Sequence, residues 1–341
     1  MIRALIVDDS PVAAKLLRFI LSSDPEIDVI GVAASGEEGI RLAASGKPDV
    51  ITMDLRMPGI DGYAAARAIM ETNPTPIVIV SGYNNKADVA GAMKALEAGA
   101  LAVLDKPEGP AHPLYKETSD KLISTVKIMS SVKVVPRRKT GAAAAAPAVT
   151  AGRRVELIAI GASTGGPQAL QVLLSALAGK VRAPVLIVQH ITKGFAPGYA
   201  EWLTSVTGME VKCPADGELC REGAAYLAPD DKHMGIDGAG RIILNSGPPL
   251  NNLRPAVEHL FRSAAASYGG RAAGILLTGM GKDGAAGLKL MRNAGAATFA
   301  QDAASCVVNG MPGEAVALGG AVYILTPEEI GAAVLMLTAE R

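Results

Sequence analysis

The segment 160–167, IGASTGGP, places a serine among glycines directly after an apolar run. Its pattern Gly161-x-Ser163-x-Gly165 has the form of a nucleophile elbow, in which glycines permit a sharp strand-to-helix turn that exposes the serine hydroxyl. A phosphate-binding loop of the Walker type is disfavoured because Pro167, and not lysine, follows the glycine pair. The segment therefore predicts a nucleophilic Ser163, and a purely structural glycine-rich turn is the alternative.

A serine nucleophile needs a base, and His190 stands 27 residues later, at the end of the apolar segment 184–189. That interval is typical of one β-α-β unit, whose two parallel strands are usually neighbours. Neighbouring strands lie about 4.8 Å apart, so side chains at the same carboxyl edge can meet. His233, which stands beside Asp230 and Asp231, is the rival base and comes from a separate loop-strand unit.

An acid that orients the histidine is predicted at Asp283, in the segment 274–284, where an apolar run enters a glycine-rich turn. Three strand ends that bring serine, histidine and aspartate to one edge of a sheet favour a catalytic triad. The alternative role for Asp283 is an N-terminal cap for a helix that begins near Gly284. The backbone amides of Thr164 and Met280 are the candidate donors to an oxyanion.

A second group of polar residues stands at strand ends in the first half of the chain: Asp8, Asp9, Asp54, Ser81 and Lys106. Ligands of an open parallel sheet bind at this edge. Carboxylates brought together repel one another, so a divalent cation such as Mg²⁺ is the natural partner. One carboxylate could then attack phosphorus and form an aspartyl phosphate. The alternative is a set of polar residues that only cap loops.

Two successive α/β patterns must position these residues. Up to about residue 115, short apolar runs alternate with amphipathic segments of helical length, which is typical of a parallel α/β sheet. The strands expected there are 4–7, 28–34, 49–53, 76–80 and 101–104. The expected helices lie near 11–22, 36–45, 62–71, 86–98 and 114–130.

The second pattern begins near residue 155 and is longer. Its expected strands are 156–160, 184–189, 224–229, 241–245, 272–278, 297–301 and 321–325. Its expected helices are 167–178, 195–205, 255–268, 284–294, 312–318 and 327–338. Between the two patterns, an alanine-rich stretch with basic clusters has no apolar periodicity and is predicted to be a flexible tether, with a basic binding arm as the alternative. We therefore predict domains over 1–130 and 155–341, joined by a linker over 131–154.

Composition limits the class of protein. The 341 residues are enough for two domains with separate cores, and 49% of them are apolar while 19% are charged. A formal net charge of zero argues against bulk attraction to nucleic acid or to an anionic membrane. The N-terminal segment does not have the form of a signal peptide, and no apolar window is long enough to span a bilayer. Three cysteines without metal-ligand spacing are typical of a reduced, cytoplasmic protein, and Cys306 is interpreted as a small buried residue, with a nucleophile as the alternative.

The N-terminal half resembles the receiver domain of two-component response regulators. The resemblance lies in VDDS (7–10), MDLRMPGIDG (53–62), Ser81 and Lys106 with the following proline. It implies a flavodoxin-like five-stranded parallel sheet of order 2-1-3-4-5 and phosphorylation of Asp54 by a histidine kinase. It also implies Mg²⁺ ligands from Asp8, Asp9, Asp54 and the Arg56 carbonyl. Val103 departs from the pattern, because many receivers have an aromatic residue at that position.

Residues 155–341 resemble the catalytic domain of the chemotaxis-type protein-glutamate methylesterases. The segments that carry this resemblance are IGASTGGP, QHITKGF, LAPDDKHM, LRPAVEHLF, LTGMGKDGAAGL and CVVNGMPGEAV. The resemblance implies a doubly wound, mostly parallel α/β domain with the triad Ser163, His190 and Asp283. The implied substrates are methylated glutamates of chemoreceptors, with deamidation of receptor glutamines as a second activity and no cofactor for the esterase chemistry. The segments 191–195 and 311–316 depart from the family pattern, which bears on substrate docking.

Two other functions stay open on the sequence. The second half could be a non-catalytic interaction module, although a helix-turn-helix pattern for DNA is absent. The esterase could also serve a chemosensory-like pathway that controls something other than motility.

Overall fold

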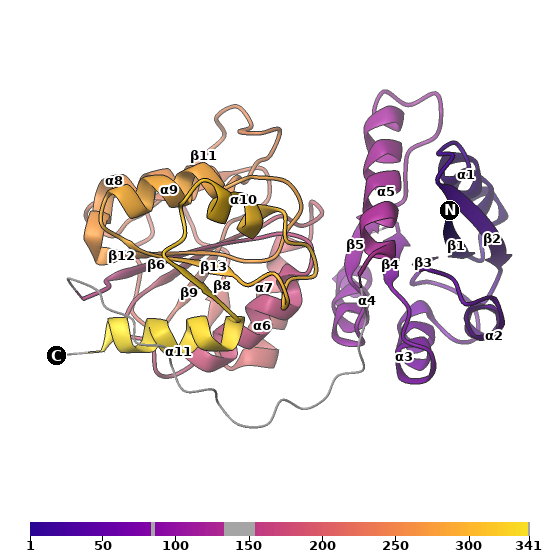
Figure 1. Cartoon of the computed structure of the whole chain (residues 1–341), viewed down its shortest axis with the longest axis horizontal. Coiled ribbons are helices and arrows are strands. Elements are labelled where there is room, and N and C mark those ends of the chain that lie inside the picture. Colours follow the sequence, from indigo (N-terminus) through magenta and orange to yellow (C-terminus); the bar gives the residue numbers. More distant parts are fainter. Residues whose placement is uncertain (83–85, 133–153, 340–341) are drawn as a thin grey trace. The chain divides into compact units, whose positions relative to one another are not determined.

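The computed structural model describes residues 1–82, 86–132 and 154–339. Within these residues the chain divides into two units, each built on its own sheet (Figure 1). The linker predicted over 131–154 falls almost wholly outside the described residues and stays a prediction. Across the described ranges, no helix has both the length and the apolar character needed to span a bilayer.

The N-terminal unit contains a parallel sheet of order β2-β1-β3-β4-β5, counted over its described residues. The strands are β1 (Ile2–Val7), β2 (Ile27–Ala33), β3 (Val50–Met53), β4 (Ile77–Ser81) and β5 (Ala102–Asp105). Strands β3 and β4 are buried along their whole length, as expected for a parallel sheet that helices cover on both faces. The flavodoxin-like order that the resemblance to receiver domains implies is therefore confirmed.

Helices cover both faces of this sheet. They are α1 (Pro11–Leu21), α2 (Gly36–Gly46), α3 (Gly62–Thr72), α4 (Lys86–Glu97) and α5 (Tyr115–Ser130). Helices α1 and α5 lie on one face, and α2, α3 and α4 lie on the other (Figure 1). Local sequence sets several helix starts, because Ser10, Ser35 and Asp61 each accept a hydrogen bond from a backbone amide in the first turn of the helix that follows.

The C-terminal unit contains a longer parallel sheet, of order β14-β13-β12-β6-β7-β9-β8 over the described residues. Its strands are β6 (Leu157–Ala162), β7 (Val185–Gln189), β8 (Val211–Lys212), β9 (Ala225–Leu227), β12 (Ala272–Leu276), β13 (Ala297–Gln301) and β14 (Tyr323–Leu325). Strand β6 lies near the middle, between β12 and β7. The prediction of a mostly parallel α/β domain is confirmed.

This second sheet is also covered on both faces. Its helices are α6 (Gly166–Leu177), α7 (Ala196–Thr207), α8 (Val257–Tyr268), α9 (Ala285–Asn293), α10 (Met311–Ala317) and α11 (Pro327–Thr338), and a short 3-10 helix, η1 (Gly269–Arg271), follows α8. Helices α8, α9 and α10 cover one face, and α6, α7 and α11 cover the other (Figure 1). The apolar core beneath α8 and α9 is closed by Val257, Phe261 and Leu288, all fully buried.

One expected strand does not join the main sheet. The segment 241–245 forms β11 (Ile242–Asn245), which pairs antiparallel with β10 (His233–Ile236) in a separate hairpin. The short strands β8 and β10 are absent from the elements that the sequence predicts, because runs of two to four residues carry little periodic signal.

Gly62 provides a test of the receiver unit, because the first turn of α3 contacts the backbone that follows β3. A Cβ on Gly62 would lie 2.0 Å from the Asp54 carbonyl oxygen and 2.8 Å from Leu55 Cα. We expect Gly62→Ala to lower the free energy of unfolding of this unit by about 1–3 kcal/mol, the usual effect of overpacking. Chemical denaturation of the full chain measures this value. Gly109→Ala is the matched control, because a Cβ there meets open space, and equal stabilities for the two variants would contradict the prediction.

Candidate active site and phosphorylation site

Ser163 lies at the turn between β6 and α6. Its amide donates to the Thr278 carbonyl (3.0 Å), and its own carbonyl accepts from the Gly166 amide (2.8 Å), which closes the turn. Gly165 has φ +78°, and a Cβ there would lie 2.5 Å from Val307 Cβ, so this position requires glycine. The segment thus forms the sharp strand-to-helix turn that the sequence predicts, with Ser163 half-buried at its start.

His190 lies beside Ser163 on the neighbouring strand. The register pairs Ala162 of β6 with Gln189 of β7, and the His190 amide donates to the Ala162 carbonyl (3.0 Å). Ser163 and His190 are therefore the first residues after two paired positions at the same carboxyl edge. A hydrogen bond between their side chains is not among the contacts of the described residues, so the serine-histidine contact is not closed in this structure.

Asp283 completes the group from the loop after β12. Its Oδ2 lies 2.9 Å from His190 Nε2, and both side chains are largely buried. The same carboxylate accepts hydrogen bonds from the backbone amides of Val257 (2.7 Å) and Glu258 (3.1 Å). Asp283 is thus a helix cap as well as the partner of His190, but the helix that it caps is α8, not the helix that follows it in sequence.

A reciprocal contact holds the loop of Asp283 in place. Glu258, in the first turn of α8, accepts a hydrogen bond from the Gly287 amide in the first turn of α9 (2.7 Å) and pairs with Arg262. Asp283, just before α9, therefore binds the N-terminus of α8, and Glu258 of α8 binds the N-terminus of α9. The helix dipole favours negative charge at both places. The position of Asp283 is fixed by α8 and α9 together.

The environment of Asp283 keeps its carboxyl group ionised. Burial raises its pKa, but the hydrogen bond and charge of His190 and the two amides of α8 lower it, and the net pKa lies below the ordinary value. An ionised Asp283 favours the His190 tautomer with its proton on Nε2. Nδ1 is then the ring nitrogen that can accept a proton from Ser163.

The amides proposed for the oxyanion lie next to these residues. The amides of Ser163 and Gly279 are already bonded to the carbonyls of Thr278 and Val308. Among the described residues, the amides of Thr164 and Met280 donate no hydrogen bond, and Met280 is 43% exposed. Their role as oxyanion donors stays a prediction.

His233, the rival base, has a structural role. It is buried on β10, where its Nε2 lies 3.1 Å from the Pro248 carbonyl oxygen and its Nδ1 accepts from the Ala256 amide (3.3 Å). Its ring stacks on that of His259 with 4.8 Å between centroids. Since both ring nitrogens are engaged, the structure favours His190 as the base.

The acids beside His233 face elsewhere. Asp230 accepts from the Gly194 amide (2.9 Å), and Asp231 forms an ion pair with Lys193. Neither contact involves a catalytic candidate, so these aspartates support the loop after β7.

The cysteines are not activated. Burial raises the thiol pKa to about 11 for Cys213 and to about 12 for both Cys220 and Cys306, so all three are protonated near neutral pH. Cys306 is half-buried, slightly more exposed than the sequence suggests, and its raised pKa argues against the alternative of a nucleophile.

Three polar residues around Ser163 are missing from the sequence predictions: Gln189, Thr278 and Gln301. The Thr278 hydroxyl donates to the Thr164 carbonyl (2.9 Å), and Gln301 accepts from the Thr278 amide (2.8 Å). Gln189 donates to the carbonyls of Ser163 and His190. The signal that could have found them is a buried polar residue at the end of an otherwise apolar strand.

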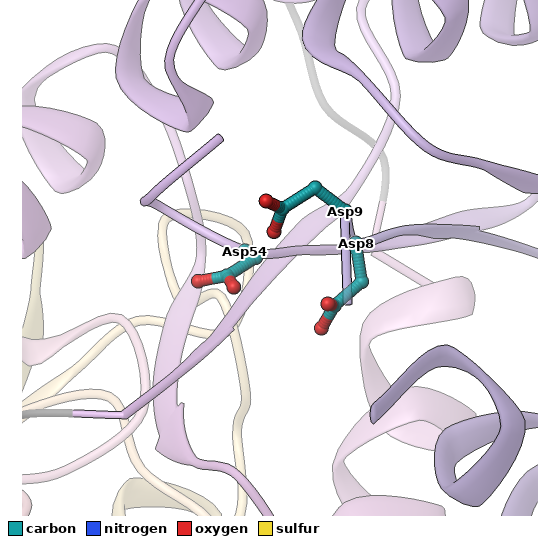
Figure 2. A group of neighbouring side chains, drawn as sticks. All are labelled: Asp8, Asp9 and Asp54. Carbon is teal, nitrogen blue, oxygen red and sulfur yellow. The ribbon is translucent and has the colours of Figure 1, made fainter. Parts of the chain in front are cut away.

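The acidic cluster of the receiver unit forms as predicted. Ligand atoms of Asp8, Asp9 and Asp54 all lie within 4.8 Å of one another at the ends of β1 and β3 (Figure 2). Lys106 Nζ lies 2.8 Å from Asp8 Oδ2 and 2.6 Å from Asp54 Oδ2. The Ser81 hydroxyl donates to Asp54 Oδ1 (2.6 Å).

Charge in this cluster favours a cation. Burial raises the pKa of Asp8 and outweighs the lowering effect of Lys106. Burial alone would lower the pKa of Lys106, but its bonds to Asp54 and Asp8 raise it above the ordinary value, so it stays positive. One ammonium group leaves three carboxylates incompletely neutralised, and an all-oxygen donor set suits Mg²⁺. The Arg56 amide donates to Asp54 Oδ1 (3.3 Å), while a role for the Arg56 carbonyl stays a prediction.

Comparison with known proteins agrees with both units. Residues 158–334 match the family model of the CheB methylesterase, and residues 4–114 match that of the response regulator receiver domain. The chain belongs to the CheB methylesterase family. It is 47% identical, over all of this chain and 98% of the relative, to a protein of Nitrosospira multiformis named protein-glutamate methylesterase/protein-glutamine glutaminase. A protein of Syntrophus aciditrophicus named protein-glutamate methylesterase/protein-glutamine glutaminase 1 is also 47% identical, over 99% of this chain and 98% of the relative.

A solved structure supports the fold of the C-terminal unit. The crystal structure of the CheB methylesterase catalytic domain of Thermotoga maritima is 35% identical, with a TM-score of 0.52, and covers 54% of this chain and 98% of its own. Receiver and methylesterase units therefore occur here in the order that the sequence predicts for this family.

Two substitutions at Asp283 separate its two roles. Asp283→Asn keeps one acceptor oxygen for α8 but cannot stabilise the charged imidazole, so we expect esterase turnover to fall by about 10⁴-fold while the fold persists. Asp283→Ala should lose the same activity and also about 1–3 kcal/mol of stability, because amides of α8 lose their acceptor. Ester hydrolysis and thermal unfolding measure the two effects. Near-normal turnover by Asp283→Asn would mean that Asp283 is only a helix cap.

Proposed function

We propose that this protein is a phosphorylation-controlled serine esterase that hydrolyses glutamate γ-methyl esters on chemoreceptors and deamidates specific receptor glutamines. The observation that carries the proposal is the His190–Asp283 pair at the same strand edge as Ser163, in a chain related over its full length to proteins named for these two activities. The setting is a cytoplasmic chemotaxis or chemosensory-like pathway. The proposed partners are a histidine kinase and methyl-accepting receptors, with no nucleic acid and no insertion into a membrane.

Acylation starts at Ser163. Its Oγ attacks the ester carbonyl carbon while His190 accepts the hydroxyl proton, and Asp283 stabilises the imidazolium that forms. The amides of Thr164 and Met280 donate to the negative oxygen of the tetrahedral intermediate. His190 then protonates the methoxy oxygen, so methanol leaves and an acyl-serine remains. With a glutamine substrate the leaving group is ammonia.

Deacylation repeats these steps with water. His190 removes a proton from a water molecule that attacks the acyl carbon, and the proton returns to Ser163 Oγ as the ester bond breaks. The product is a glutamate carboxylate, and the enzyme is restored. None of these steps calls for a cofactor.

The receiver unit supplies the control. Asp54 attacks phosphorus of the kinase phosphohistidine and becomes an aspartyl phosphate, while Lys106 and Ser81 lie within reach of its oxygens. Mg²⁺ held by Asp8, Asp9 and Asp54, with the Arg56 carbonyl, would neutralise charge on the phosphoryl group. Val103 replaces the aromatic residue common in receivers, so the signal must pass without an aromatic side chain at this position.

Ser163→Ala tests the nucleophile. We expect the variant to release no measurable methanol from methylated receptor membranes, because the proposed acyl intermediate forms on the Ser163 hydroxyl. Gas chromatography of released methanol provides the measurement, and Ser175→Ala, which changes a serine on the exposed side of α6, serves as the control. Full methanol release by Ser163→Ala would refute the triad assignment.

Asp54→Asn tests the control. A small phosphodonor with Mg²⁺ should label the parent chain and raise its rate of methanol release, whereas Asp54→Asn should show neither effect. Chelation of Mg²⁺ should abolish labelling of the parent chain, since the carboxylates would then repel the phosphodonor. Stimulation of Asp54→Asn equal to that of the parent chain would contradict the assignment of Asp54 as phosphoacceptor.

A further inference from the structure

Gln189 connects the nucleophile and the base through their backbones. It is the last residue of β7 and is 4% exposed. Its Nε2 donates to the Ser163 carbonyl (2.8 Å) and to the carbonyl of His190 (2.9 Å). A single carboxamide therefore fixes the peptide groups that follow both residues.

The remaining contacts of Gln189 show how closely it is fitted. The side chains of successive strand residues point to opposite faces of a sheet, so the side chains of Gln189 and His190 are expected on opposite faces. A Cβ on Gly166 would lie 2.0 Å from Gln189 Oε1, so the absent side chain of Gly166 makes room for the carboxamide under the first turn of α6. Oε1 has no hydrogen-bond partner among the described residues. A buried acceptor without a partner is costly, and the two bonds of Nε2 offset that cost.

Peptide geometry carries the effect to the proposed oxyanion site. The carbonyl of Ser163 and the amide of Thr164 belong to one planar, trans peptide, so they point in opposite directions. The carbonyl is held by Gln189 Nε2 and by the Gly166 amide, and the amide of Thr164 is therefore turned away from Gln189. The next carbonyl, that of Thr164, is held by the Thr278 hydroxyl. Two successive peptides of the turn are thus fixed by buried side chains.

We propose that Gln189 is a positioning residue for acyl transfer, which orients the Thr164 amide toward the oxyanion and sets the spacing of Ser163 and His190. The inference rests on the proposed function, because it assigns to the Thr164 amide the task of stabilising a tetrahedral intermediate. Gln189 bonds the backbone carbonyls of Ser163 and His190 and not their reactive side chains. Its loss should therefore raise the barrier of the chemical step and leave substrate binding unchanged.

Gln189→Met in the full chain is the central test, because methionine has similar length and volume but no N–H donor. We expect kcat for methanol release to fall by about 10²-fold, in the range found when an oxyanion donor is lost. KM should stay within about twofold of the parent value, since ground-state contacts persist. The rate at which a fluorophosphonate probe labels Ser163 should fall in parallel. All assays contain the same phosphodonor and Mg²⁺.

A matched control separates positioning from stability. Thr207→Val removes two buried hydrogen bonds at the end of α7, one to the Leu203 carbonyl and one from the Met209 amide, and α7 contributes no residue to the site. Thermal unfolding of both variants shows how much fold stability each loses, and labelling is expressed per folded molecule. Thr207→Val should label at the parent rate, while Gln189→Met should not. If Gln189→Met does not fold, Gln189→Leu, which is smaller and also lacks an N–H donor, replaces it.

The outcomes are distinct. Parent-like labelling and kcat in a folded but destabilised Gln189 variant would overturn the inference and leave Gln189 as a core residue. A raised KM with unchanged kcat would also overturn it, because the residue would then serve binding. If the parent chain labels at Ser163 but releases no methanol, the receptor substrate is wrong, while the labelling rates still decide the role of Gln189. A parent chain that does not label at Ser163 would refute the proposed function and this inference with it.

Discussion

The carboxylate of Asp283 is the contact on which the geometry of the candidate esterase site depends. It faces His190 and at the same time accepts two amides from the start of α8. Glu258 of that helix in turn binds the start of α9. Asp283 is therefore held in place by two helices that pack on each other. A buried carboxylate needs such donors to stay ionised, and the same donors hold it rigidly. Under the proposed triad, stability and catalysis share one set of hydrogen bonds.

Both units place their chemistry according to one rule. In a parallel sheet all carboxyl ends of the strands lie at one edge, where loops leave the strands and ligands bind. The receiver unit collects Asp8, Asp54 and Ser81 there, and the methylesterase unit collects Ser163 and His190. In the receiver unit, charge is concentrated so that a cation and a phosphoryl group can be held. The methylesterase unit instead isolates one carboxylate behind one histidine, which suits proton transfer from a serine.

Much of this organisation could be predicted from the sequence, because strands and helices of ordinary length leave a periodic signal. The proximity of Ser163 and His190 follows from β-α-β connectivity, while the order of the receiver sheet was implied by the resemblance to response regulators. The hairpin of β10 and β11 could not be predicted in the same way, since its strands are short and its antiparallel pairing depends on α8 beneath it. His233 illustrates the consequence, because its two engaged nitrogens become apparent only when Pro248 and Ala256 are in place.

The sequence by itself determined which residues have reactive groups and on which strand ends they stand. Only the tertiary structure decided how those groups are oriented: that Asp283 caps α8, that Thr278 holds the Thr164 carbonyl, and that Gln189 joins the carbonyls of Ser163 and His190. The physical reason is that periodicity reports burial along one element, whereas hydrogen bonds between residues far apart in the chain depend on how the elements pack. The sequence shows only that Gln189 is a polar residue at the end of an apolar strand. Its hydrogen-bond partners, the carbonyls of Ser163 and His190, are brought to it by the fold.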